Sequence, residues 1–168
     1  VYYLEVRDGN DDAAAEQPYT LATTFAPSPD MAEPNNDFGQ ASTLSFDQPQ
    51  RATILPVRDA DWLAVTVDRH GELNLAITGV PADLEVVVRL WNSNKDVITN
   101  WFAPLAKGGE TTATVDLPLP GRYYIEIRDS NDDARSVQPF TVTASFSPSP
   151  DALESNNGFG QATALTLG

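Results

Sequence analysis

Cysteine is absent from the 168 residues, and His70 is the only histidine. The absence of cysteine excludes disulfide bonds and thiolate metal sites, and a single histidine excludes a catalytic zinc site in practice. No serine sits in a nucleophile-elbow or oxyanion motif that could combine with His70. Because no catalytic constellation is present, we expect a protein that is not an enzyme.

Basic residues are also scarce, with 10 Lys and Arg against 24 Asp and Glu, for a net charge of −14. This charge disfavours binding to nucleic acid and to anionic lipid surfaces. No apolar run approaches a membrane span. The surplus carboxylates suit a secreted protein and offer oxygen ligands to hard cations such as Ca²⁺. Val1 opens a strand-like segment, so we expect the sequence to be part of a longer chain.

What is abundant is strand patterning. Hydrophobic residues make up 41% of the sequence, enough for a packed core. Apolar and polar residues alternate with period two, whereas helical spacing is nearly absent apart from a short turn at 35–44. The expected strands are 52–57, 62–68, 72–79, 84–92, 96–102, 111–117, 121–128 and 139–146. They predict an all-β fold, an antiparallel jelly-roll-like β-sandwich.

The sequence repeats itself. Residues 2–46 align without a gap to residues 123–167, and about half of the aligned positions are identical. Substitutions such as Leu4 to Ile125 and Leu21 to Val142 keep the apolar character of alternating positions. We therefore expect tandem modules with a period of 121 residues, the offset from Tyr2 to Tyr123.

The period divides the chain into three parts. Residues 1–26 are expected to be the C-terminal strands of a preceding module, 27–150 a complete module with its linker, and 151–168 the start of a following module. Two strands alone do not bury enough apolar surface to be stable. Residues 1–26 should therefore be completed either by more of the same chain or by a neighbouring copy, head to tail.

Two acidic clusters could bind a cation. At the start of the complete module, Glu33-Pro-Asn-Asn is followed by Asp59-Ala-Asp61, which supplies the carboxylate and amide oxygens that Ca²⁺ prefers. The alternative is that both stretches only cap and turn the chain. The second cluster, Asp129, Asn131, Asp132 and Asp133, repeats residues 8–12 between two strands. There a turn is the favoured interpretation and a metal site the second choice.

Six segments of the sequence form a recognisable combination, namely EPNNDFGQA, DADWLAV, GELNLAI, ADLEVVVRLWN, GRYYIEIRD and QPFTVTA. Together they resemble the bacterial pre-peptidase C-terminal domain family, which includes the collagen-binding domains of clostridial collagenases. The resemblance implies a calcium site that joins the start of the module to the sandwich, with Glu33, Asn35, Asn36, Asp59 and Asp61 as its residues. The third part repeats Glu154, Asn156 and Asn157 without the aspartate pair. Asp37 is excluded because Gly158 matches it.

Two functions remain open. The first is a calcium-stiffened structural or adhesive repeat of a long, fibre-forming surface protein, with neighbouring copies as its partners. The second is an ancillary module of a secreted hydrolase that binds polysaccharide or a matrix protein such as collagen. Trp62, Trp91 and Tyr124 fall on the outward strand parity and could form its ligand platform, unless a loop covers them. Both functions, and the family resemblance, imply a secreted bacterial protein outside the cell or at its surface.

Overall fold

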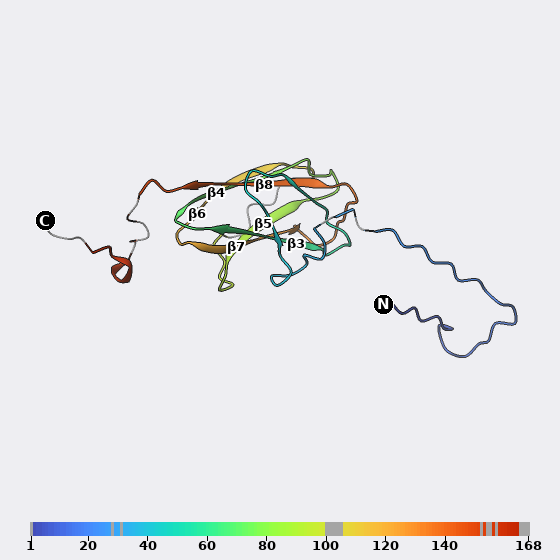
Figure 1. Ribbon diagram of the computed structural model, residues 1–168. Coiled ribbons are helices and arrows are strands. Elements are labelled where there is room, and N and C mark those ends of the chain that lie inside the picture. The colour runs from blue at the N-terminus through green and yellow to red at the C-terminus, as the bar shows by residue number, and fades with distance from the viewer. Residues whose placement is uncertain are drawn as a thin grey trace.

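A computed structural model describes residues 2–27, 29–30, 32–99, 106–151, 153, 156 and 158–164. Its strands form two four-stranded sheets, with the order β1-β3-β7-β5 in one and β2-β8-β4-β6 in the other (Figure 1). The strands are β1 (Ser42–Thr43), β2 (Gln50–Ala52), β3 (Ala60–Val67), β4 (Gly71–Thr78), β5 (Val86–Asn92), β6 (Thr111–Leu117), β7 (Gly121–Asp129) and β8 (Phe140–Pro148), and a 3-10 helix covers Phe159–Gln161.

The predicted β-sandwich is confirmed. Odd-numbered strands build one sheet and even-numbered strands the other, so each connection crosses between the layers, as in a jelly roll. All strand pairs are antiparallel except the short parallel pair of β1 with β3. None of the helical segments in the described part of the chain reaches the length and apolarity needed to span a bilayer.

Six of the expected strands agree with the structure to within two residues at each end, and two differ more strongly. The strand expected at 52–57 ends at Ala52, because the N–H groups of Thr53 and Leu55 donate to the carboxylates of Asp30 and Asp59 instead of to a strand. The strand expected at 96–102 is reduced to one bridge, between Val97 and Trp91. Residues 100–102 lie outside the described residues.

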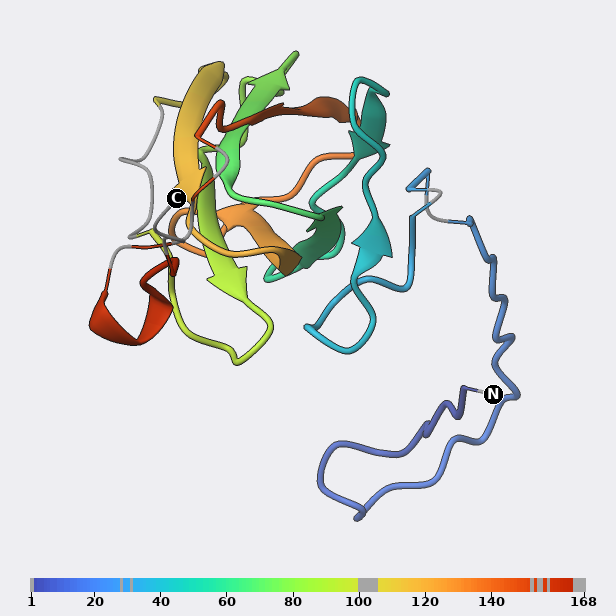
Figure 2. The ribbon, with the colours of Figure 1, turned by 60° about the vertical axis from the view of Figure 1, so that its left-hand side comes forward.

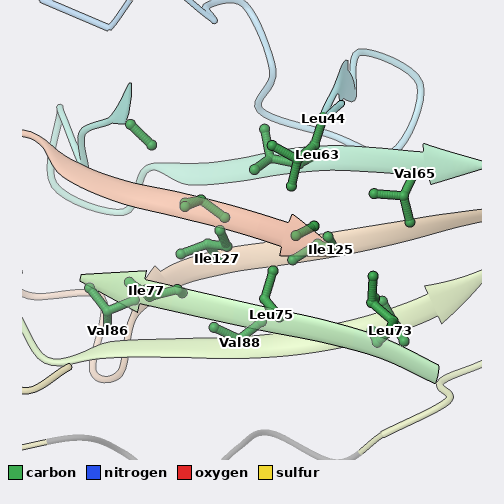
Figure 3. Packing of buried hydrophobic residues seen from close by; sticks show 14 of the residues in the cluster. Leu44, Leu63, Val65, Leu73, Leu75, Ile77, Val86, Val88, Ile125 and Ile127 are labelled. Atoms are coloured by element: carbon green, nitrogen blue, oxygen red, sulfur yellow. The ribbon is translucent and has the colours of Figure 1, made fainter. Parts of the chain in front are cut away.

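The core lies between the two sheets and is built from the inward-facing residues of the alternating pattern. Figure 3 shows Leu63, Ile125 and Ile127 of one sheet facing Leu75 and Ile77 of the other, and all five side chains are buried. Full burial of an aliphatic side chain contributes about 1.5–3 kcal/mol. The period-two pattern is therefore the main source of the stability of the module.

The chain enters and leaves the sandwich at opposite ends. The segment before β1 approaches one end, and the chain beyond β8 departs from the other (Figure 1). At the far end the ladder between β4 and β8 runs to the pair of Gly71 with Pro148, and the Ser149 N–H donates to the carbonyl of His70 at 2.9 Å. Residues 2–27 extend away from the sandwich without forming a strand (Figure 2).

Candidate cation site

The opening segment, residues 32–40, lies against the start of β3. The Trp62 N–H donates to the carbonyl of Asn35 at 2.8 Å, which fixes the segment to the strand. Asp61 shares the inward parity of Leu63 and Val65 along β3. Strand alternation therefore places a carboxylate in line with the hydrophobic core, where a charged group is expensive unless it is paired.

Polar contacts join the predicted residues of this site. Asn35 Nδ2 donates to Asp61 Oδ1 at 2.8 Å, and its backbone N–H donates to Glu33 Oε2 at 2.9 Å. Asn36 Nδ2 donates to the same Glu33 oxygen at 3.1 Å. Asp59 Oδ2 accepts the N–H of Leu55 at 2.8 Å. The segment containing Glu33 thus meets Asp61 of β3 through the side-chain hydrogen bond of Asn35.

Three buried oxygen atoms at this site have no hydrogen-bond donor among the described residues. They are Oδ1 of Asn35, Oδ1 of Asp59 and Oδ2 of Asp61. Asn35 and Asp61 have no exposed surface, and Asp59 is only 4% exposed. An unpaired acceptor in such a position costs about 1–3 kcal/mol. All three atoms are acceptors, so the group that would complete them is a cation or a hydrogen-bond donor.

The electrostatics point the same way. Burial raises the pKa of Asp61 to about 8, and the negative charges of Asp30, Asp59 and Glu33 add to the rise. Burial also raises the pKa of Asp59 to about 6, with Glu33 and Asp30 contributing again. No lysine or arginine is among the causes of either shift. Neighbouring negative charges therefore add to the cost of ionising both aspartates.

The carboxylates of Glu33, Asp59 and Asp61 do not form a complete metal-binding geometry. Within the described ranges, no group of three or more His, Asp or Glu side chains is positioned to hold a metal ion. The donor set nevertheless fits Ca²⁺, because it contains only carboxylate and amide oxygens. Hydrogen bonds join four of the five predicted residues, Glu33, Asn35, Asn36 and Asp61. Asp59 contributes only its charge to the raised pKa of Asp61, and the unsatisfied oxygens are on Asn35, Asp59 and Asp61.

Asp30 belongs to this region and was missed by the sequence analysis. It is buried, its Oδ1 accepts the N–H of Ala32, and its Oδ2 accepts the N–H of Thr53, both at 2.8 Å. It also contributes to the raised pKa of both aspartates of the site. The signal in the sequence was the repetition of Asp30 as Asp151 within the Pro-Ser-Pro-Asp stretch.

The second acidic cluster has a different geometry. The buried Asp129 carboxylate accepts three backbone N–H groups, from Glu85 at 3.0 Å, Asp133 at 3.2 Å and Ala134 at 3.3 Å. Asp132 pairs with Arg128 at 3.0 Å, and Asn131 is exposed. This geometry gives Asp129 a role in organising the loop after β7. In the third part of the chain, Asn156 is described, whereas Glu154 and Asn157 lie outside the described residues.

The aromatic residues gather on the outer face of the first sheet. The rings of Trp62 and Trp91 lie 5.8 Å apart, and Phe38 of the opening segment stacks on Tyr124 at 3.7 Å. The Phe38 ring also meets the edge of Trp62 at 5.8 Å. Phe38 thus covers Tyr124, as expected if a loop lies over the platform. The stack also holds the opening segment on the sheet.

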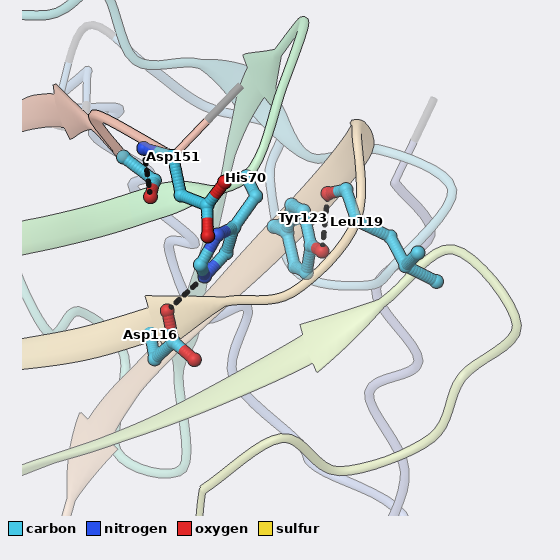
Figure 4. A network of polar contacts seen from close by, with 6 residues as sticks. His70, Asp116, Leu119, Tyr123 and Asp151 are labelled. Atoms are coloured by element: carbon cyan, nitrogen blue, oxygen red, sulfur yellow. Dashed lines mark hydrogen bonds and ion pairs between the residues drawn. The ribbon is translucent and has the colours of Figure 1, made fainter. Parts of the chain in front are cut away.

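His70 lies in the turn between β3 and β4, at the far end from the cation site. Its Nε2 is 2.7 Å from Asp116 Oδ1 (Figure 4). In the departing chain, Asp151 donates its backbone N–H to Ser149 Oγ at 3.2 Å. Among the described residues, the hydrogen bonds of the histidine ring reach no serine or threonine hydroxyl. A serine-histidine nucleophile is therefore not formed here.

Comparisons with known proteins identify no family for this chain. No protein-family model matches the sequence, and no curated protein matches it. Solved structures do resemble it. The pre-peptidase C-terminal domain of a Bacillus anthracis collagenase has 13% identity and a TM-score of 0.48, covering 62% of this chain and 93% of that one.

A second similar structure is CorA, a surface-associated copper-binding protein of Methylomicrobium album BG8. It has 10% identity and a TM-score of 0.43, and the match covers 64% of this chain and 98% of that one. With identities and TM-scores this low, neither likeness carries a function to the present chain.

Proposed function

We propose that this chain is part of an extracellular, non-catalytic repeat protein whose modules are stiffened by Ca²⁺ at the opening segment. The observation that carries the proposal is the set of three buried, unpaired oxygens on Asn35, Asp59 and Asp61. These residues are among the five for which the sequence resemblance implies calcium. Native structures rarely contain several buried acceptors without partners in one place, unless a ligand binds to them.

Calcium would act at this site as a counter-charge. Asp61 would bind it from β3 and Asp59 from the residue just before that strand. Glu33, Asn35 and Asn36 would bind it from the opening segment. One ion would thus join two parts of the chain that are now held by hydrogen bonds such as that of Asn35 to Asp61. Because its pKa is raised to about 8, the Asp61 carboxyl group holds a proton near neutral pH, and binding of the ion would release that proton.

Two observations support a structural array. The self-similarity of 121 residues recurs on both sides of the complete module, and the chain enters and leaves that module at opposite ends. Ser149 is still held by the module, because its N–H donates to the carbonyl of His70 in the turn before β4. Asp151 matches Asp30, which is buried at the start of the complete module. Only Pro150 lies between Ser149 and Asp151. A single proline with a restricted φ is a stiff connection. Successive modules would therefore be joined without slack.

The calcium test is thermal unfolding of residues 27–150 in excess Ca²⁺ and in EGTA. A ligand that binds only the native state stabilises it by about 2.7 kcal/mol when its concentration is about 100 times Kd. We expect Tm to rise by several degrees with Ca²⁺ in the unmodified module, and this rise to disappear in the Glu33→Ala and Asp61→Ala variants.

A matched control is Asp133→Asn, which removes an exposed charge from the second cluster. This variant should keep the full calcium response. An equal Tm in Ca²⁺ and EGTA for the unmodified module would contradict the proposal, and the opening segment would then be only a turn. Loss of the response in Asp133→Asn alone would move the ion to the second cluster.

A further inference from the structure

The N-terminal arm, residues 2–25, is an extended segment that exposes a large apolar surface. Tyr2 is 94% exposed, Tyr3 91% and Phe25 82%, and Leu4 and Leu21 are also exposed. The arm runs away from the sandwich in both views of the molecule (Figures 1 and 2). Contiguous exposed apolar residues of this extent mark a surface that binds another protein surface.

Four apolar residues of the arm have counterparts, 121 positions later, that lie in the core. Tyr123 is 4% exposed, and Ile125, Phe140 and Val142 are buried in β7 and β8. In the arm, the corresponding residues are Tyr2, Leu4, Tyr19 and Leu21. The arm therefore carries the inward face of two core strands, but nothing in the described chain covers that face.

We propose that the arm is a two-strand donor that completes a second sandwich of the same repeat, by filling the places of β7 and β8. The inference rests on the proposed repeat array and adds the partner and the register. The partner is a copy of the part of the repeat that forms the opening segment and β1 to β6. Within this chain those places are already filled, since β7 pairs with β3 and β5, and β8 pairs with β2 and β4.

The repeat fixes the register of the donated strands. Ile125 lies opposite Leu63 on β3 and Leu90 on β5, so Leu4 would lie opposite the same two residues of the partner copy. Val142 lies opposite Ile77 on β4, and Leu21 would take that position. By the same rule Tyr3 takes the place of Tyr124. It would then lie under the partner's equivalent of Phe38.

The turn of the arm already has the conformation that the partner requires. Asp8 Oδ2 accepts the N–H groups of Asn10 at 3.2 Å and Asp12 at 3.1 Å, much as Asp129 Oδ2 accepts N–H groups of the loop that follows it. Asp11 has a φ of 57° and Asp132 a φ of 56°. A turn that forms before binding lowers the entropic cost of docking.

The ion pairs and the remaining acceptor also correspond. Arg7 pairs with Asp11 at 3.8 Å, as Arg128 pairs with Asp132. In the complete module, Asp129 Oδ1 accepts the N–H of Glu85 in the loop before β5. Asp8 would offer its Oδ1 to the equivalent N–H of the partner. The donor therefore brings its own hydrogen-bond acceptor for the end of the sheet as well as its apolar face.

The experiment supplies the partner from the chain itself. A second copy of residues 27–121 is fused directly before Val1. Val1 matches Arg122 in the repeat, so the arm then follows the copy of β1 to β6 just as β7 follows β6 in the complete module. Hydrogen exchange of the arm amides is compared in the fusion and in the unextended chain. We expect exchange at Leu4 and Leu21 to slow by at least about 100-fold in the fusion, because amides in core strands open only by sub-global unfolding.

Two substitutions in the fusion test the face of the strand. Leu21→Asp places a charge at the position of the buried Val142 and should abolish the protection of the arm. Thr20→Asp is the matched control, since its counterpart Thr141 lies on the partly exposed outer face, and it should leave the protection in place. Fast exchange throughout the arm of the unmodified fusion, with the original module still folded, would overturn the proposal.

A second experiment tests the proposal even if the fusion does not fold. In the module 27–150, residues 123–146 are replaced by residues 2–25, and cooperative unfolding is expected to persist. Loss of cooperative unfolding in this graft would also overturn the donor proposal. The calcium response of the unmodified module is measured separately, so failure of the donor proposal is distinguishable from failure of the proposed function.

Discussion

Replacing Asp61 with asparagine should have opposite effects in the absence and presence of calcium. Asparagine keeps an oxygen to accept from Asn35 but carries no charge. In the metal-free protein, the pKa of Asp61 is raised from 3.8 to about 8, mainly by burial. The native state therefore holds a proton that the unfolded chain releases between these values. The free energy of unfolding of the metal-free protein should accordingly fall as the pH rises from about 4 to about 8.

The size of the effect follows from the shift. Each pKa unit corresponds to about 1.4 kcal/mol, so a fully expressed shift would cost the metal-free protein up to about 4 kcal/mol between roughly pH 5 and pH 8. Asp59 also lowers the free energy of unfolding as the pH rises, by a smaller amount, and its contribution stops changing above its raised pKa of about 6. Asp61→Asn removes the larger part of this dependence.

Urea denaturation of residues 27–150 at about pH 5 and about pH 8, with EGTA or Ca²⁺, measures all four combinations. In EGTA near pH 8, Asp61→Asn should be more stable than the unmodified module, by on the order of 2–4 kcal/mol. Its calcium-dependent stabilisation should be absent. If the variant is instead less stable in EGTA near pH 8, and the unmodified module shows no loss of stability with rising pH, the account of a buried, uncompensated carboxylate is wrong.

Three further substitutions test other parts of the structure by the same denaturation assay. Phe38→Ala should cost about 1–3 kcal/mol and blue- or red-shift the tryptophan emission, since Phe38 contacts Trp62; an unchanged midpoint and spectrum would contradict its role in holding the opening segment. Ile125→Ala should cost about 2–5 kcal/mol, because the side chain is fully buried, and a loss below 1 kcal/mol would mean the core is packed differently. Asp129→Ala should cost about 2–4 kcal/mol through its three lost N–H partners, with calcium response retained; loss of that response would assign Asp129 to the ion.

The sandwich was predictable because alternation along a strand is a local property. Leu63 and Val65, or Ile125 and Ile127, alternate with polar neighbours, and this pattern survives any choice of strand order. The ends of strands were less predictable. The strand expected to continue beyond Ala52 stops there because Asp30, more than twenty residues earlier, takes the N–H of Thr53. A long-range side-chain contact of this kind leaves no periodic signal.

The candidate site was also predictable from the sequence only in part. The composition of the stretches from Glu33 and from Asp59 indicated oxygen ligands, and the structure brings the two stretches together. The sequence could not show that Asp61 faces inward with one oxygen unpaired, since that depends on how the opening segment lies on β3. It also could not show that Phe38 covers Tyr124, because the two residues are distant in the chain.

The opposite placement of the two ends of the module determines how it would respond to mechanical load. Tension along an array would pull β8 lengthwise at one end, where it is held between β4 and β2. At the other end it would pull on the opening segment, where β1 contributes only the short pairing of Ser42 and Thr43 with β3. Asp30, Asn35 and Phe38 would then resist most of the force. We expect the opening segment to yield first, so a calcium ion bound there would set the force at which each module begins to lengthen.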